Sequence, residues 1–173
     1  MPCKKIVLIG VESSGKTTLT KVLAEQLQGS YVPEYARIYL DANGLTYQQA
    51  DLLAIAKGQI QLYQEAQSKE QDWLLCDTDL LVIKVWSEQV FGSCNEWIIQ
   101  QIKLMQPDLY ILCTPDIAWE YDPQRTMPHL EDRLALHQHY KALLEQLACK
   151  FITVNGTIEN RIQQVTAVLS NWE

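Results

Sequence analysis

One segment near the start of the chain restricts the fold more than any other, and it reads Gly10-Val11-Glu12-Ser13-Ser14-Gly15-Lys16-Thr17. A glycine, four variable residues and then Gly-Lys-Thr form the pattern of a phosphate-binding loop. Its glycines allow a tight turn whose backbone N–H groups surround phosphate oxygens. The β-branched run at 5–9 before the loop predicts a strand, and the apolar spacing after it predicts a helix. This order of elements predicts a nucleotide-binding domain.

The residues of this loop, together with the one that follows it, are the predicted contacts to ATP. Lys16 is expected to reach the β- and γ-phosphates and to act in catalysis. The hydroxyl of Thr17 is a predicted ligand of Mg²⁺. ATP and Mg²⁺ are therefore the predicted cofactors. The predicted ATP contacts are Gly10, Glu12, Ser13, Ser14, Gly15, Lys16, Thr17 and Thr18.

Apolar strand patterns alternate with longer helical patterns along the rest of the chain. This alternation predicts the fold class α/β: a single P-loop NTPase domain over 1–173, with a five-stranded parallel sheet, helices on both faces and a lid. The lid is expected at approximately 116–128, a polar loop interrupted by prolines. Further strands are predicted at 30–34, 73–77, 109–113 and 151–154. Helices are predicted at 17–27, 47–69, 80–90, 96–105, 130–148 and 158–169.

Composition narrows the functional classes. The net charge of −7 disfavours a broad nucleic-acid surface, which would need clustered Lys and Arg. No apolar run is long enough to span a bilayer, so we expect no membrane partner. The five cysteines show no metal-ligand spacing and fit a reducing cytosol. The sequence thus favours a cytoplasmic protein that acts on a small molecule, and it leaves the oligomeric state open.

Acidic residues end or follow two of the predicted strands. Glu34 ends the second, whereas Asp77 ends the third and Asp79 comes two residues later. Because ligands bind at the carboxyl ends of parallel strands, we expect these acids beside the phosphate loop. Asp77 is the predicted catalytic acid and metal ligand; it could hold Mg²⁺ or accept the proton of an attacking hydroxyl. Asp79 could do either, or could cap the following helix; the sequence leaves open which acid is the base.

The polar loop supplies the arginine that a phosphotransferase lid needs. Arg125 is the predicted catalytic arginine, which would neutralise charge on the transferring phosphoryl group. Arg133 is a second candidate, with an ion pair to neighbouring acids as its alternative role. Arg161 is predicted to be a surface residue of the last helix. A GTPase is disfavoured, because its Asp-x-x-Gly switch and Asn-Lys-x-Asp base reader do not follow the third and fifth strands.

Four segments carry a family resemblance: the phosphate loop, Pro33–Arg37, Cys76–Asp79 and Trp119-x-x-Asp122-x-x-Arg125. Together they resemble the ribosylnicotinamide kinase domain of NadR-type proteins, which are P-loop kinase-like NTPases within an AAA-type ATPase family. The resemblance covers nearly the whole chain. It implies phosphoryl transfer from ATP, with Mg²⁺, to the 5′-hydroxyl of nicotinamide riboside, a step of NAD biosynthesis. Pro123 stands where the family often has glycine.

A nucleoside with a cationic pyridinium suits carboxylates and aromatic faces. The predicted substrate contacts are Glu34, Tyr35, Arg37, Asp79, Trp119 and Asp122. Tyr39 and Trp86 are further candidates to stack on the ring, although the apolar surroundings of Trp86 favour a core position. Two alternatives remain: a kinase of another nucleoside or small alcohol, and a nucleotide-sensing regulatory ATPase.

Overall fold

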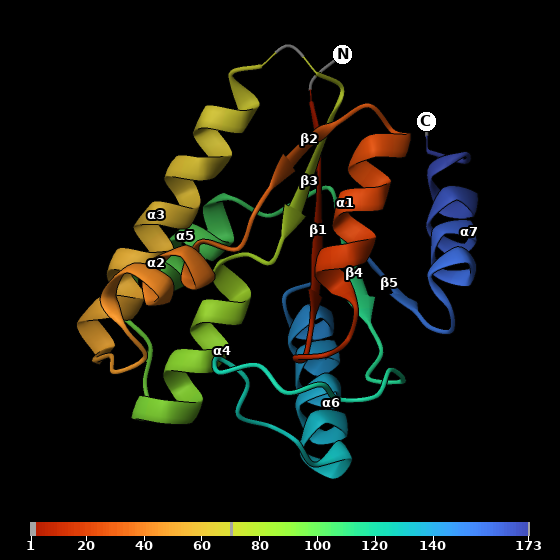
Figure 1. The fold of residues 1–173 in the computed structure, drawn as a ribbon. Coiled ribbons are helices and arrows are strands. Elements are labelled where there is room, and N and C mark those ends of the chain that lie inside the picture. Colours follow the sequence, from red (N-terminus) through yellow and green to blue (C-terminus); the bar gives the residue numbers. More distant parts are fainter. Residues whose placement is uncertain (1–2, 70, 173) are drawn as a thin grey trace.

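The computed structural model describes residues 3–69 and 71–172 and contains a five-stranded parallel sheet (Figure 1). The strands lie in the order β2-β3-β1-β4-β5. Because neighbouring strands are parallel, their carboxyl ends meet at one edge of the sheet. The predicted α/β fold is confirmed. The strands are β1 (Lys4–Gly10), β2 (Ser30–Val32), β3 (Trp73–Asp77), β4 (Leu109–Cys113) and β5 (Phe151–Val154).

The central strand β1 places the phosphate loop in the middle of that edge. Leu8 of β1 lies opposite Asp77 of β3, and Gly10 lies opposite Cys113 of β4. The side chains from Ile6 to Ile9 are fully buried. A continuous apolar run of this kind is expected for a parallel strand that is covered on both faces.

Helices cover both faces of the sheet, as predicted (Figure 1). Ile6 and Leu8 point to one face and pack in a cluster with residues of α1 (Lys16–Gln26) and α7 (Ile158–Leu169). Val7 and Ile9 point to the other face, where a larger cluster includes residues of the remaining helices. Those helices are α2 (Tyr35–Asn43), α3 (Gln49–Gln67), α4 (Leu80–Phe91), α5 (Glu96–Leu104) and α6 (Leu130–Gln146).

Helix α2 was not predicted from the sequence. It begins immediately after Glu34 and buries only Ala36 and Leu40, so its apolar face is too short to give a clear helical pattern. The strand before it ends at Val32 instead of the predicted Glu34. Pro33 explains the early end, because a proline cannot donate a hydrogen bond to a neighbouring strand.

The segment 114–129 between β4 and α6 contains no helix or strand and includes the predicted lid. All five cysteines are free thiols. Among the described residues, no helix is long and apolar enough to cross a membrane.

Candidate active site

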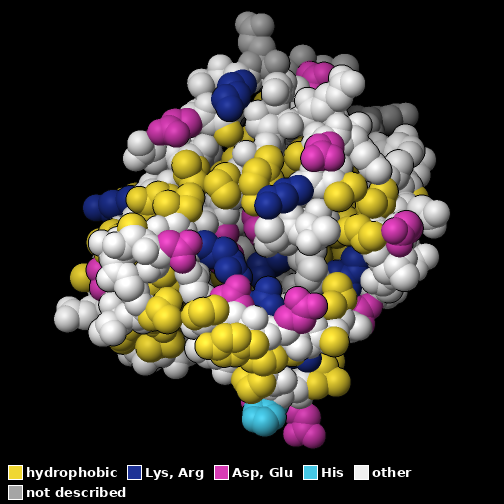
Figure 2. All heavy atoms as spheres, viewed as in Figure 1, with side chains coloured by type: hydrophobic (Ala, Val, Ile, Leu, Met, Phe, Trp, Pro, Cys, Tyr) yellow, Lys and Arg dark blue, Asp and Glu magenta, His cyan; other side chains and the backbone are white. Residues whose placement is uncertain are grey.

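A cavity of about 620 Å³ opens at the carboxyl edge of the sheet. All eight predicted ATP contacts line it, and so do Glu34, which precedes α2, and Arg37, which belongs to α2. Helices α4 and α6 and the lid residues 124–127 complete its wall. Lysine and arginine side chains gather in the hollow, with acidic side chains around them (Figure 2). The cavity therefore combines the phosphate loop with residues from distant parts of the chain.

The phosphate loop has the geometry that anion binding needs. A Cβ on Gly10 would lie 2.8 Å from the Ser14 hydroxyl and 2.9 Å from the Cys113 carbonyl, so only glycine fits. Gly15 is the N-cap of α1 in the left-handed region (φ 76°), and no side chain caps the first N–H groups. Those donors and the positive end of the helix are therefore available to phosphate. Lys16 Nζ donates to the Val11 carbonyl at 3.3 Å.

Two acids lie near the loop in different environments. Glu34 is partly buried and lines the cavity. Burial raises the pKa of Glu34; Asp77 and Asp122 raise it further, while Lys16 and Arg37 oppose the rise. Asp77 has an exposed fraction of only 1%, and its Oδ1 has no hydrogen-bond partner among the described residues. It is not among the residues that line the cavity.

The oxygen donors here fit Mg²⁺. This hard cation prefers carboxylate, hydroxyl, phosphate and water oxygens. Thr17 offers a hydroxyl, and the orphaned Oδ1 of Asp77 is a buried acceptor that a metal-bound water could satisfy. Within 3–69 and 71–172, no group of three or more His, Cys, Asp or Glu side chains could hold a metal. An ion at this place would therefore need phosphate and water oxygens as well, as kinase sites usually provide.

Asp79 has a structural role. Its Oδ1 accepts a hydrogen bond from the Leu81 N–H at 2.9 Å and caps α4, and its Oδ2 accepts one from the Tyr110 hydroxyl at 2.6 Å. The side chain is buried and does not line the cavity. The helix-cap alternative is confirmed, and the geometry does not support the predicted substrate contact.

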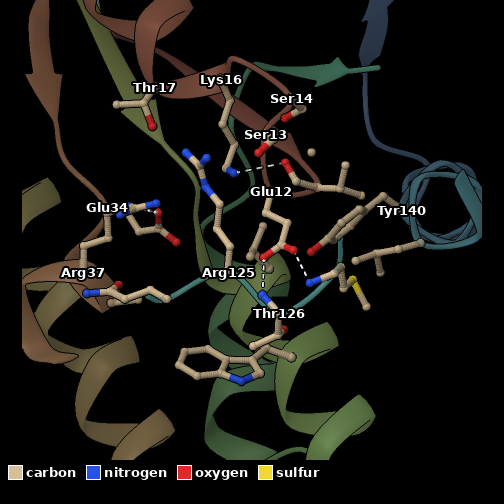
Figure 3. A pocket seen from close by; sticks show the side chains of 18 of the residues that line it. Glu12, Ser13, Ser14, Lys16, Thr17, Glu34, Arg37, Arg125, Thr126 and Tyr140 are labelled. Atoms are coloured by element: carbon tan, nitrogen blue, oxygen red, sulfur yellow. Dashed lines mark hydrogen bonds and ion pairs between the residues drawn. The ribbon is translucent and has the colours of Figure 1, made fainter. Parts of the chain in front are cut away.

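The predicted lid segment is bound to the phosphate loop by the side chain of Glu12. Its carboxylate accepts hydrogen bonds from the Thr126 N–H at 2.9 Å and from the Met127 N–H (Figure 3). It also accepts one from the indole N–H of Trp119 at 3.1 Å. The Ser13 hydroxyl also accepts one from the Glu120 N–H at 3.3 Å. The segment thus lies over the loop, and Trp119 points to Glu12 rather than lining the cavity.

Arg125 extends from the lid into the cavity (Figure 3). Its Nη1 donates to the Glu120 carbonyl at 2.8 Å. Arg37 links α2 to the lid through Asp122 at 3.0 Å, and it also approaches Glu34 at 3.7 Å. A second cavity of about 280 Å³ is lined by residues of 117–120 and of the start of α7. Arg125 lines both cavities, and both touch the phosphate loop.

The prediction that Arg161 is a surface residue is wrong. Its exposed fraction is 1%, and its guanidinium donates to the carbonyls of Ser14, Thr114 and Gly156 and pairs with Asp116. The reason is topological: the first turn of α7 passes beside the loop, where several carbonyls need donors.

Arg133 is also buried, although the predicted alternative was an ion pair with neighbouring acids. It donates instead to the Ile117 carbonyl at 3.2 Å, and so holds the start of the lid.

The aromatic residues around the cavity differ in part from those predicted. Trp86, one of the stacking candidates, packs against the core as expected and also lines the cavity, and it donates its indole N–H to the Tyr47 hydroxyl at 2.9 Å. Tyr47 and Tyr140 also line it, and no sequence motif marks either residue. Tyr35 is absent from the lining and packs against Gly58. Tyr39 donates to Asp51 at 2.7 Å.

A protein-family model described as an AAA domain (AAA_28) matches residues 5–161. The chain belongs to this family. This AAA_28 chain is similar to the trifunctional NAD biosynthesis/regulator proteins NadR of Escherichia coli K12 and Salmonella typhimurium LT2, each 26% identical over 155 residues. The match covers 87% of this chain but only 38% of either relative. The resemblance to NadR-type proteins is thereby confirmed.

Solved structures place the AAA_28 chain among P-loop kinase folds. A NadR protein in complex with NR has a TM-score of 0.77 and 22% identity, covering 98% of this chain and 51% of that one. A thymidylate kinase from Candida albicans has a TM-score of 0.73 and 15% identity, covering 98% of this chain and 92% of that one. At these identities the likeness establishes the fold.

Proposed function

We propose that this chain is an ATP-dependent kinase that phosphorylates the 5′-hydroxyl of nicotinamide riboside to give nicotinamide mononucleotide. The observation that carries the proposal is a single cavity that joins the phosphate loop to a cluster of aromatic side chains, with Lys16 and Arg125 between them. The similarity to NadR proteins, one of which was solved in complex with NR, supports this acceptor. The product would enter NAD biosynthesis.

The phosphate loop would hold the nucleotide. Its backbone N–H groups and Lys16 would surround the β- and γ-phosphates, and the adenine would occupy the smaller cavity beside Ile117 and Ile158. Mg²⁺, when bound, would neutralise phosphate charge. Thr17 would ligate it directly and Asp77 through water, which satisfies the unpartnered Oδ1.

Glu34 is the better placed acid to accept the proton of the attacking hydroxyl, because it lines the cavity whereas Asp77 does not. A general base works best when its pKa approaches the working pH, and burial raises the pKa of Glu34 in that direction. Arg37, which lines the cavity, would contact the ribose, and Asp122, which does not line it, would hold the Arg37 guanidinium in place. Arg125 would stabilise the charge that develops on the transferring phosphoryl group.

The aromatic end of the cavity would receive the pyridinium ring. Trp86 and Tyr47 pack edge to face with their ring centroids 4.8 Å apart, and Tyr140 lines the cavity from α6. A cation over an aromatic face gains about 0.5–2 kcal/mol. This arrangement therefore favours a cationic nucleoside over a neutral one of the same size.

The test is ADP release from Mg-ATP, measured with and without nicotinamide riboside and beside a panel of neutral nucleosides. We expect nicotinamide riboside to give the strongest stimulation. If another nucleoside alone stimulates ADP release, the chain is still a kinase, but its acceptor is that nucleoside. ATP binding without any acceptor-dependent turnover would instead indicate the regulatory ATPase.

A further inference from the structure

A buried amide on α3 bridges the backbone on both sides of Glu34. Gln59 has an exposed fraction of 1%. Its Oε1 accepts a hydrogen bond from the Tyr35 N–H at 2.8 Å, and its Nε2 donates to the Pro33 carbonyl at 3.1 Å. The amide therefore pairs with one backbone N–H and one backbone carbonyl, on the two residues that flank Glu34, and it fixes the backbone at this position.

The residue before Gln59 fits the same purpose. Gly58 lies against the ring of Tyr35, where a Cβ would overlap the ring carbons. The missing side chain lets the first turn of α2 approach α3 closely, and the two helices lie side by side (Figure 1). The position of Glu34 between β2 and α2 is therefore fixed both by packing and by the two hydrogen bonds of Gln59.

One turn further along α3, Tyr63 holds the backbone beside the second acid. Its buried hydroxyl donates to the Thr78 carbonyl at 2.9 Å. Thr78 directly follows Asp77 and has a φ of 70°, a left-handed conformation that is unfavourable for a residue other than glycine. The Thr78 N–H donates to the Leu8 carbonyl at 2.9 Å. Tyr63 and Leu8 together hold this unfavourable turn.

Gln59 and Tyr63 are four residues apart and therefore project from the same face of α3. We propose that this face positions both acids of the site, with Gln59 acting through Glu34 and Tyr63 acting through Asp77. They are positioning residues, since neither lines the cavity. The proposal rests on the kinase function proposed above, and it assigns to α3 a role in catalysis as well as in the core.

The first test replaces Gln59 with leucine, which keeps the size and removes both hydrogen bonds. The matched control is Gln61→Leu, at an exposed glutamine of the same helix whose side chain bonds to Glu65 one turn away. Misplacement of a reacting group by about 1 Å can cost about 100-fold, so we expect Gln59→Leu to lower kcat by roughly 10- to 100-fold. The KM for Mg-ATP should change little, because the phosphate loop is intact. Gln61→Leu should match the wild type.

A double-mutant cycle separates positioning from general destabilisation. In a Glu34→Gln background, Gln59→Leu should cost much less in kcat than it does in the wild type. The same cycle with Tyr63→Phe and Asp77→Asn should show the same loss of effect. In the crossed pairs, such as Gln59→Leu with Asp77→Asn, the fold-losses in kcat of the two substitutions should multiply.

Equal costs of Gln59→Leu with and without Glu34 would overturn the proposal, and so would an unchanged kcat. If the leucine variant does not fold, Gln59→Glu replaces it: this variant keeps the acceptor for Tyr35 and loses the donor for Pro33. If no acceptor stimulates ATP turnover by the wild type, the proposed function fails. Amide hydrogen exchange then tests separately whether Gln59 holds the backbone beside Glu34. Exchange at Tyr35 should be slow in the wild type and at least about tenfold faster in Gln59→Leu, and equal rates would refute the inference.

Discussion

The two halves of this site are built in opposite ways. The phosphate-binding half is one continuous segment, in which the backbone itself offers the donors and Gly10 and Gly15 set the geometry. The half that contains Glu34, Asp77 and Arg125 is assembled from three separate connections, and side chains hold it through Gln59, Tyr63 and Glu12. If the chain is the proposed kinase, ATP binding is encoded locally, whereas phosphoryl transfer depends on tertiary contacts.

The largest expected effect lies in the assembled half. Arg125→Ala should lower kcat by roughly 10³-fold or more, because an arginine that neutralises transition-state charge contributes about 10³- to 10⁵-fold. ATP binding should weaken far less. Steady-state kinetics with Mg-ATP and the acceptor measures both quantities. Lys103→Ala, an exposed cation on α5, is the control. A loss below about tenfold would show that the lid arginine is not used in the transition state.

The second effect concerns the acid. Glu34→Gln should lower kcat by roughly 10²- to 10⁴-fold, the usual range for general base catalysis. In the wild type, kcat should fall as the pH is lowered through the pKa of Glu34, which burial places above the ordinary glutamate range. The pH profile of kcat measures this. If kcat does not begin to fall until the pH reaches the ordinary pKa of glutamate, Glu34 is not the general base.

The same substitution has a stability consequence with a definite sign. A raised pKa means that the folded state binds this proton more tightly than the unfolded state, so folding stability is lost as the pH rises through the folded pKa. Glu34→Gln should therefore unfold at a higher temperature than the wild type at neutral pH. The difference should vanish below the ordinary pKa of glutamate. Thermal unfolding at both pH values checks this, and a lower unfolding temperature at neutral pH would contradict it.

The contrast between the halves explains what could be predicted from the sequence. The loop and the five strands follow from local patterns, and they were predicted almost to the residue. Helix α2 was not predicted, because only Ala36 and Leu40 of this helix are buried and two residues give no clear helical pattern. Arg161 was predicted to lie on the surface because its actual surroundings come from a segment far along the chain, namely the phosphate loop. Tertiary contacts of this kind leave no local signal, and neither Tyr47 nor Tyr140 is marked by any motif.

The next prediction tests the local half. Lys16→Met should lower kcat by roughly 10²- to 10³-fold, the usual loss when one electrostatic donor is removed. Unlike Arg125→Ala, it should also raise the KM for ATP, because Lys16 would contact the nucleotide in the ground state as well. Lys21→Met, at an exposed position of α1, is the control. If the KM for ATP stays unchanged, the division between a binding half and a catalytic half is not valid.

The smallest effect is expected where the two halves meet. Glu12 belongs to the local segment, but its carboxylate accepts three N–H donors from the lid. Glu12→Gln leaves a single acceptor oxygen and adds an amide N–H₂ that faces those donors. Because a hydrogen bond to a charged group contributes about 1.5–3 kcal/mol, we expect the KM for ATP to rise roughly tenfold as the lid loosens.

The direction of this change separates two physical effects of Glu12. Its negative charge also lies in the loop that would hold a triphosphate, so neutralising it could strengthen ATP binding by reducing repulsion. A raised KM, with faster amide exchange at Thr126 and Met127, would show that the hydrogen bonds to the lid dominate. A lowered KM would show that repulsion dominates, and the lid would then close for reasons unrelated to Glu12. Glu25→Gln, at an exposed position of α1, should change neither quantity.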